Sequence, residues 1–375
     1  MKVVLYGFGK LGKRVYASLI NNKDIELVGI VDNAVSEGGE KNVDDLTIYS
    51  IREFKRRNIS VDCVVIAIIE PRSAFDAYLS SVGVAKRIFR VPVKYLEFSL
   101  SFKDNLSFFD DLIDVTQNNL PYVEMHVQDN CNLNCVACAH YSPLFKDNEL
   151  TFSQFAEDIQ RMRDIFSGDI FMIRLMGGEP FLNKDLERYI EVVREHFEHS
   201  DVHIVTNGLL FLGIEQKILD AIISNHIIVD ISDYEPNRKL KSKIIKFAEE
   251  NGVHISWVLN TREENSFSKS LSINELQNDV NPCENSMSCI NIYKGKYAKC
   301  PQLMFLPKFN EYFHVDLPSD GIYDLYDKNL TAEKFICNIS KSEKLCRYCD
   351  MVNPKWITWN CYTTQKRPVI EDWLI

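Results

Sequence analysis

The chain has 375 residues, enough for two or three domains with sizeable cores. Its content of 46% hydrophobic and 26% charged residues is that of a globular protein, and a net charge of −10 disfavours nucleic-acid binding through a basic surface. Apolar runs stay below the ~20 residues that span a bilayer, and no signal-like segment precedes the first strand. We therefore expect a cytoplasmic protein without nucleic-acid or membrane partners, whose eleven cysteines indicate metal binding.

The first 95 residues carry the pattern of a dinucleotide-binding unit. The pattern begins with a strand at 2–6 and a G-x-G-x-x-G turn formed by Gly7, Gly9 and Gly12. A helix at 13–20, a second strand at 27–31 and the acidic residue Asp32 follow. The glycines permit a close approach of backbone to phosphate, and a carboxylate at this place can accept hydrogen bonds from a ribose. With further strands expected at 62–68 and 87–90, residues 1–95 are predicted to form a Rossmann-like parallel sheet.

This stretch resembles the N-terminal domains of bacterial sugar O-acyltransferases and of sugar-pathway methyltransferases. They share the Gly-rich turn and the Val31-Asp32-Asn33 ending of the second strand. The resemblance implies a nucleotide or nucleotide-sugar at Gly7, Gly9, Gly12 and Asp32. NAD(P) is one alternative ligand, and a scaffold that binds nothing and mediates protein contacts is another.

Residues 94–120 mix aromatic and acidic side chains at partly helical spacing. We expect a connecting helix over 96–118 that packs between domains. A Phe-rich binding groove is the alternative.

Three cysteines follow a predicted strand at 122–127 with the spacing C-x3-C-x2-C, namely Cys131, Cys135 and Cys138. A [4Fe–4S] cluster normally takes four thiolates, so three would leave one iron open. An open coordination position marks a metal that performs chemistry. The loop leaves the end of a strand, where α/β folds place their sites. A zinc site or three unrelated thiols would also explain this spacing taken alone.

More polar turns follow the next predicted strands. The strand at 170–175 runs into Gly177-Gly178-Glu179-Pro180, the strand at 202–205 into Thr206-Asn207-Gly208, and the strand at 227–231 into Ser232. A further strand is expected at 255–259, and amphipathic helices at 152–166, 184–197 and 241–251. Alternating strands and helices predict a βα-repeat fold with these motifs at the carboxyl ends of its strands.

The cysteine spacing, the G-G-E-P motif and the T-N-G turn together resemble radical S-adenosylmethionine (SAM) enzymes. The resemblance implies a partial (β/α)6 barrel over residues 119–275 and a [4Fe–4S] cluster whose open iron binds SAM. Gly177, Gly178 and Glu179 would hold the SAM amino group, with Asn207 and Ser232 as candidates for its ribose and carboxylate.

One position departs from the family pattern. Most members carry an aromatic residue before the third cysteine, where this chain has Ala137, and Tyr141 is the candidate to replace its packing near the adenine. His140 is a candidate substrate contact, with a structural histidine as the alternative. No catalytic residue is predicted beyond the cluster and the SAM site.

Seven further cysteines lie beyond residue 280, around a predicted hairpin that turns at Lys294-Gly295. The C-x11-G-x4-C run followed by C-x2-C resembles the single-cluster Twitch module of radical SAM enzymes and lacks the continuation of the larger SPASM module. Residues 276–375 are therefore predicted to hold an auxiliary iron–sulfur cluster through Cys300, Cys346, Cys349 and either Cys283 or Cys289. A zinc site is the alternative. Cys63, Cys337 and Cys361 are expected to be spectators.

The predicted fold class is α/β: a Rossmann-like sheet, a partial barrel and a small Cys-rich module. The resemblance implies an oxidoreductase or transformase that cleaves SAM reductively to a 5′-deoxyadenosyl radical, with an external one-electron donor such as flavodoxin or ferredoxin. The favoured substrate is a nucleotide-linked sugar of polysaccharide or secondary-metabolite biosynthesis that is oxidised, epimerised or deoxygenated. The alternatives are a maturase of peptide or protein side chains and a non-catalytic iron–sulfur protein.

Overall fold

The computed structural model describes residues 1–35, 41–92, 112–117, 120–166, 168, 170–258, 266–276, 283, 287–362 and 367–375. The chain divides into two compact units. The first consists of Met1–Pro121, Ser167–Phe171 and His199–Asp201, and the second of Tyr122–Phe166, Met172–Glu198 and Val202–Ile375. Within the described ranges, no helix is both long and apolar enough to cross a membrane.

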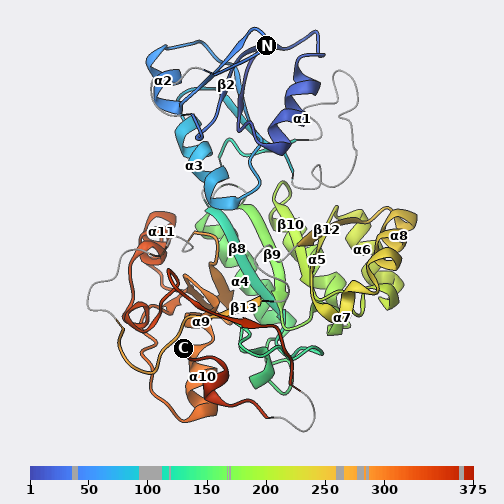
Figure 1. The fold of residues 1–375 in the computed structure, drawn as a ribbon, viewed down its shortest axis with the longest axis vertical. Coiled ribbons are helices and arrows are strands. Elements are labelled where there is room, and N and C mark those ends of the chain that lie inside the picture. Colours follow the sequence, from blue (N-terminus) through green and yellow to red (C-terminus); the bar gives the residue numbers. More distant parts are fainter. Residues whose placement is uncertain are drawn as a thin grey trace. The chain divides into compact units, whose positions relative to one another are not determined.

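The first unit is built around a sheet with the strand order β3-β4-β2-β1-β5-β6-β7. Its elements are β1 (Lys2–Tyr6), α1 (Lys10–Leu19), β2 (Glu26–Val31), β3 (Lys41–Val43), β4 (Leu46–Tyr49), α2 (Ile51–Arg56), β5 (Cys63–Ile66), α3 (Pro71–Ser81), β6 (Arg87–Arg90) and β7 (Ile113–Asp114). Strand β1 pairs in parallel with both β2 and β5, so the direction of winding reverses at β1. Figure 1 shows α1 on one side of this sheet and α2 and α3 on the other. The predicted strands of this unit are confirmed, in a doubly wound arrangement.

The connecting helix predicted over 96–118 is wrong where the structure describes it. Ile113 and Asp114 form strand β7, which pairs antiparallel with β6. Asp114 then accepts hydrogen bonds from the backbone and hydroxyl of Thr116, which turn the chain. Residues 93–111, 118 and 119 lie outside the described residues.

The second unit carries a sheet with the strand order β12-β11-β10-β9-β8-β14-β15-β16. Strands and helices alternate along the chain: β8 (Leu120–Gln128), α4 (Phe152–Ile165), β9 (Ile170–Gly177), α5 (Leu186–His196), β10 (Asp201–Thr206), α6 (Gln216–Ser224), β11 (Ile228–Ser232), α7 (Glu235–Arg238), α8 (Lys241–Asn251) and β12 (His254–Val258). Figure 1 shows α5, α6 and α8 gathered beside β9 to β12. Because strands β8 to β12 follow one another without reversal, their carboxyl ends lie along one edge, where the predicted motifs begin.

The C-terminal elements extend this sheet at its β8 edge. They are β13 (Ser266–Lys269), β14 (Asn291–Tyr293), β15 (Lys296–Ala298), α9 (Pro301–Met304), α10 (Leu306–Phe313), β16 (Tyr323–Asp324), α11 (Ala332–Ser340) and β17 (Lys355–Thr358). The predicted hairpin is confirmed as β14–β15, and its turn places Lys294 and Gly295 at φ 48° and 74°. Strand β13 pairs with β17 in a separate two-stranded sheet, so the six-stranded barrel remains a prediction beyond the five strands β8 to β12.

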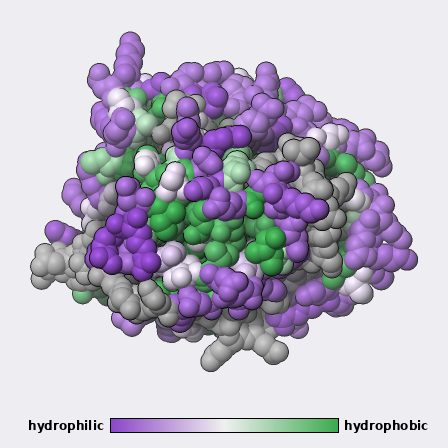
Figure 2. Space-filling view, turned by 90° about the horizontal axis from the view of Figure 1, so that it is seen from above, coloured by the Kyte–Doolittle hydropathy of each residue, from purple (hydrophilic) through white to green (hydrophobic). Residues whose placement is uncertain are grey.

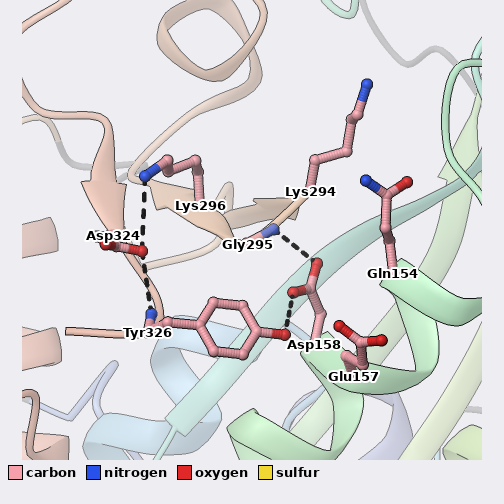
Figure 3. A pocket seen from close by; sticks show the side chains of 8 residues that line it. All are labelled: Gln154, Glu157, Asp158, Lys294, Gly295, Lys296, Asp324 and Tyr326. Carbon is pink, nitrogen blue, oxygen red and sulfur yellow. Dashed lines mark hydrogen bonds and ion pairs between the residues drawn. The ribbon is translucent and has the colours of Figure 1, made fainter. Parts of the chain in front are cut away.

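A cavity of about 280 Å³ lies between α4 and the hairpin, and none of the predicted site residues lines it (Figure 3). Asp158 of α4 is buried there. Its carboxylate accepts hydrogen bonds from the backbone of Gly295 at 3.0 Å and from the Tyr326 hydroxyl at 2.9 Å (Figure 3). These contacts fix the hairpin turn to α4.

We expect Asp158→Asn to preserve stability at neutral pH and Asp158→Ala to lower the free energy of unfolding by about 1–3 kcal/mol. Burial raises the pKa of Asp158, so the fold favours its protonated form. The wild type should therefore lose stability relative to Asp158→Asn as pH rises from about 4 towards 7. Urea unfolding at both pH values measures this, with Asp164→Asn at an exposed position of α4 as the control. A loss in Asp158→Asn equal to that in Asp158→Ala would contradict the account.

Figure 2 shows one face of the molecule, with a group of apolar residues bordered by hydrophilic ones. Exposed large apolar side chains also occur singly, as at Ile20, Leu79 and Val82 of the first unit. Scattered exposure of this kind is ordinary for a protein surface.

Candidate functional site

The three-cysteine loop begins where β8 ends, and the backbone coils tightly through it. Asn134, Ala137 and Tyr141 all have positive φ angles, between 48° and 60°. The loop therefore bends three times within eight residues, with Cys135 buried and Cys131 and Cys138 partly buried. Burial raises the pKa of Cys131 to about 11 and raises that of Cys135 further. In the absence of a metal both thiols are protonated at neutral pH, so binding of a metal would release their protons.

The G-G-E-P turn packs directly against the end of β8. The backbone of Gly178 donates to the carbonyl of Gln128 at 2.7 Å, and that of Glu179 to the carbonyl of Asn130 at 3.1 Å. A Cβ at Gly177 or Gly178 would overlap these two carbonyl oxygens. The two glycines therefore let two backbone segments meet, and they bring the G-E-P turn against the start of the cysteine loop.

Glu179 is fully buried, and protein groups surround its carboxylate. It accepts hydrogen bonds from the Thr206 hydroxyl at 2.7 Å, the backbone of Asn207 at 2.9 Å and the backbone of Phe181 at 3.1 Å. Burial raises the pKa of Glu179 to about 7, although the three donors act to lower it. The residue predicted to hold the SAM amino group thus also joins the G-G-E-P turn to the T-N-G turn.

Asn207 connects the turns to the cysteine loop. Its side-chain amide donates to the Oδ1 of the Asn132 side chain at 2.8 Å and approaches the Cys131 sulfur at 3.8 Å. The amide of buried Asn237 donates to the backbone carbonyls of Asn207 at 2.8 Å and Ser232 at 2.6 Å. The structure therefore brings together all the residues predicted for SAM on this edge: Gly177, Gly178, Glu179, Asn207 and Ser232.

Tyr141 occupies a core position. Its ring is fully buried and packs on Phe309 of α10 and on Trp373, with centroids 5.0 Å and 6.1 Å apart. This placement does not favour the predicted adenine contact, because both neighbours are core side chains of the C-terminal segment. The left-handed backbone at Tyr141, which turns the chain towards α10, gave no signal in the sequence.

His140 lies beside a buried carboxylate. Its Nε2 is 3.4 Å from Glu124, which also accepts from the hydroxyl of Tyr122 at 2.5 Å and the amide of Asn291 at 2.8 Å. The ring of His140 is also 5.1 Å from that of His126. Both roles considered for His140 fit this position.

The predicted auxiliary cysteines lie near one another, although among the described residues no three of them already form a metal-holding group. Cys300 directly precedes α9, and burial, together with the neighbouring thiols of Cys349, Cys346 and Cys283, raises its pKa to about 12. Burial also raises the pKa of Cys289, close to Cys300 and Cys283. Cys349 approaches the hydroxyl of Ser270 at 3.5 Å. The five candidate ligands thus come from separate stretches of chain, and four thiolates are needed to hold a cluster.

The remaining cysteines separate clearly. Cys63 is buried in β5, where burial raises its pKa to about 12, and Cys337 is exposed on α11. The backbone of Cys361 instead pairs with that of Cys135 in an isolated antiparallel β-bridge, and both thiols are free. The third presumed spectator therefore lies beside the three-cysteine loop.

The Gly-rich turn of the first unit is packed against α1 and hydrogen-bonded to Asp32. Gly7 has φ 99°, and a Cβ at Gly12 would overlap the carbonyl oxygen of Gly7, so α1 packs tightly on the turn. Gly9 faces open space. The carboxylate of Asp32 accepts from the backbone of Phe8 at 2.5 Å and of Ala34 at 2.8 Å. An acid predicted to face a ribose thus bonds the turn itself, which disfavours a phosphate at the Phe8 amide.

The sheet of the second unit has one polar face. Arg174 of β9 contacts Asp230 of β11 at 2.9 Å, and His203 of β10 lies 2.9 Å from the same carboxylate oxygen. Their alternate neighbours are apolar and buried, such as Ile173 and Val229. Parallel sheets are usually apolar on both faces. Arg174, with 28% of its side chain exposed, reaches open space from this polar face.

Sequence reasoning missed several residues of this site, namely Thr206, Arg174, Asn237 and Trp359. Thr206 stands in the T-N-G turn itself, and Arg174 interrupts an apolar strand. Thr206 offered a signal as a polar residue at the end of a strand, and Arg174 as a polar residue within a buried strand. Asn237 and Trp359 offered none, because the contact of Asn237 with Asn207 and that of Trp359 with Cys135 join distant parts of the chain.

The donor set fits an iron–sulfur cluster by its chemistry. One short loop carries three thiols. The side-chain amide of Asn207 donates to the Cys131 sulfur, and the indole of Trp359 donates to the Cys135 sulfur. Soft thiolates with N–H donors around them suit such clusters. Among the described residues, no three His, Cys, Asp or Glu side chains already form a metal-holding group. Binding would therefore draw the thiols together.

Comparison with known proteins supports this description. The radical SAM superfamily profile matches residues 125–254, and a profile described as C2185-like, N-terminal matches residues 1–88. GTP 3′,8-cyclase of Nautilia profundicola is 28% identical over 110 residues, covering 29% of this chain and 35% of the relative. The same enzyme of Sulfurimonas denitrificans is 31% identical over 113 residues, covering 29% and 34%. The chain thus matches about a third of the length of these curated relatives.

Solved structures show weaker likeness. The crystal structure of BtrN in complex with AdoMet and 2-DOIA has a TM-score of 0.41 and 14% identity, covering 62% of this chain and 94% of that one. Streptococcus suis SuiB bound to S-adenosylmethionine has a TM-score of 0.30 and 18% identity, covering 36% and 32%. The family profile spans the cysteine loop, the G-G-E-P turn, the T-N-G turn and Ser232, so the chain contains a radical SAM domain at residues 125–254.

Proposed function

We propose that this chain is a radical SAM enzyme that acts on a nucleotide-linked sugar. One observation carries the proposal: the G-G-E-P and T-N-G turns are bonded to each other through Glu179, and Asn207 bonds them to the cysteine loop. When bound, a [4Fe–4S] cluster with SAM supplies reductive SAM cleavage and hydrogen-atom removal from the substrate. The electron would come from an external donor of the flavodoxin or ferredoxin class.

The chain's own residues would bind and orient these groups. Cys131, Cys135 and Cys138 would hold the cluster, and Glu179 with the Gly177–Gly178 backbone would bind the SAM amino group. Asn207 and Ser232 would contact the ribose and carboxylate of SAM. Cys300, Cys346, Cys349 and either Cys283 or Cys289 would hold a second cluster, which would accept an electron from the substrate or anchor it.

The polar face of the second sheet supports a hydroxylated substrate. Arg174 is partly exposed and offers guanidinium donors, while the buried carboxylate of Asp230 balances its charge. Such donors are suited to sugar hydroxyls, which can accept hydrogen bonds. A nucleotide-sugar carries such hydroxyls, and the position of Asp32 does not favour its phosphate at the Gly-rich turn.

The test is an anaerobic assay of the reconstituted protein with SAM and dithionite. UDP-glucose, UDP-N-acetylglucosamine and dTDP-glucose would be added separately, with 5′-deoxyadenosine and sugar masses measured by mass spectrometry. We expect one sugar to stimulate 5′-deoxyadenosine formation and to change in mass. SAM cleavage with every sugar unchanged would contradict the substrate proposal, and absence of SAM cleavage would support a non-catalytic iron–sulfur protein.

A further inference from the structure

A segment close to the C-terminus pairs with the cysteine loop through an isolated antiparallel β-bridge. The backbone of Val136 donates to the carbonyl of Asn360 at 2.9 Å, and that of Tyr362 donates to the carbonyl of Asn134 at 2.9 Å. These bonds flank the Cys135–Cys361 bridge, which is therefore a non-hydrogen-bonded pair with closely spaced side chains. Residues 359–362, named the C-terminal strap, thus fix the middle of the cysteine loop.

Trp359 is the residue of the C-terminal strap that reaches a thiol. Its indole Nε1–H donates to the Cys135 sulfur at 3.2 Å, across 224 positions of sequence. The indole stacks on Tyr234, with ring centroids 5.8 Å apart and planes at 30°. Tyr234 follows the end of β11 and also contacts the Phe267 ring at 5.9 Å. Stacking on Tyr234 therefore holds the indole in place.

We propose that Trp359 is a positioning residue that orients the Cys135 sulfur and raises the reduction potential of the cluster at Cys131, Cys135 and Cys138. This inference rests on the proposed function. A hydrogen bond to sulfur stabilises negative charge on the cluster, and the reduced cluster carries one more negative charge than the oxidised cluster. The bond therefore favours reduction. Asn207 approaches Cys131 at the longer distance of 3.8 Å and should contribute less.

The consequence concerns delivery of the electron. The extent of reduction by a donor of fixed potential depends on the cluster's own potential. Trp359 would therefore set the fraction of protein that carries a reduced cluster. An indole N–H can only donate, and phenylalanine keeps an aromatic ring without the donor. Trp359→Phe therefore removes the N–H and preserves a ring that can stack on Tyr234.

The chain offers a matched control for this substitution. The indole of Trp373 donates to the same loop, but to the backbone carbonyl of Cys138, at 2.9 Å. Trp373→Phe therefore removes an indole bond to the loop and leaves the sulfurs untouched. Trp356, which is 43% exposed on β17, provides a second control.

The experiment is a redox titration of reconstituted full-length variants, followed by electron paramagnetic resonance and by iron analysis. The change in signal on adding SAM identifies the cluster of the three-cysteine loop. At the wild-type midpoint, Trp359→Phe should lower the ratio of reduced to oxidised cluster by about three- to tenfold, with unchanged iron content. Tenfold corresponds to about 59 mV for one electron. Trp359→His, which retains an N–H, should recover part of the shift, and both controls should match the wild type.

Separate results would overturn the inference and the proposed function. A Trp359→Phe protein with wild-type iron and wild-type midpoint, or an equal shift in Trp373→Phe, would show that Trp359 does not act on the sulfur. If Trp359→Phe loses iron, the test rests on Trp359→His with full iron content. A ratio of reduced to oxidised cluster within about threefold of the wild type supports the inference, and a fall of about three- to tenfold overturns it. A wild-type protein without a SAM-responsive cluster would refute the proposed function and the inference with it.

Discussion

Replacing Glu179 with alanine is expected to abolish SAM cleavage and to lower the free energy of unfolding by about 3 kcal/mol. The buried carboxylate accepts hydrogen bonds from Thr206, Asn207 and Phe181. Alanine would leave two backbone N–H groups and one hydroxyl without their acceptor inside the protein. The T-N-G turn would then lose its connection to the G-G-E-P turn, and Asn207 would no longer be held against the cysteine loop.

The measurements are 5′-deoxyadenosine formation under anaerobic reduction and urea unfolding of the protein without cofactors. Glu191→Ala on α5 is the control, because that glutamate is exposed. Glu179→Gln should fall between wild type and alanine, since its carbonyl oxygen can accept while its NH2 meets a donor. Stability of Glu179→Ala equal to that of the wild type would mean that the three hydrogen bonds do not hold the turns together.

The second large effect is expected at the auxiliary cysteines. A Cys300→Ala/Cys349→Ala protein should lose about four of about eight irons per chain after reconstitution and should still cleave SAM slowly without changing its substrate. Cys300 is buried among the thiols of Cys349, Cys346 and Cys283, so the double variant removes two of the converging ligands. Cys337→Ala on the exposed face of α11 is the matched control and should keep all its iron.

Metal analysis of the same samples separates this account from its alternative. If the double variant loses one zinc ion per chain and no iron, the auxiliary site is a zinc site and has no electron-acceptor role. If its metal content is unchanged, the convergence of the C-terminal cysteines serves another purpose.

The strands around the site could be predicted because their signals are local. Each apolar run of β8 to β11 ends in a polar turn, and the expected strands and the observed ones differ by only a few residues at their ends. Helix α6 was not predicted, although Ile218, Leu219 and Ile222 recur at helical spacing. Helices α2 and α3 of the first unit were also not predicted.

The contacts that complete the site could not be predicted, because they join distant segments. Nothing near Trp359 in the sequence indicates that its indole meets Cys135, and nothing near Asn237 indicates that it bridges two turns. The environment of Glu179 depends on where Thr206 and Asn207 fall in space. Asp32 shows the same limit: its position after β2 predicted a ribose contact, whereas the fold turns it onto the Phe8 amide.

The central claim is that the loop of Cys131, Cys135 and Cys138 holds a cluster that cleaves SAM. The most direct test is anaerobic reconstitution of the wild type and of a Cys131→Ala/Cys135→Ala/Cys138→Ala variant, with iron and 5′-deoxyadenosine measured on the same samples. We predict about eight irons per wild-type chain, about four in the variant, and 5′-deoxyadenosine from the wild type alone. Equal iron content in the two proteins, or 5′-deoxyadenosine from the variant, would contradict the claim.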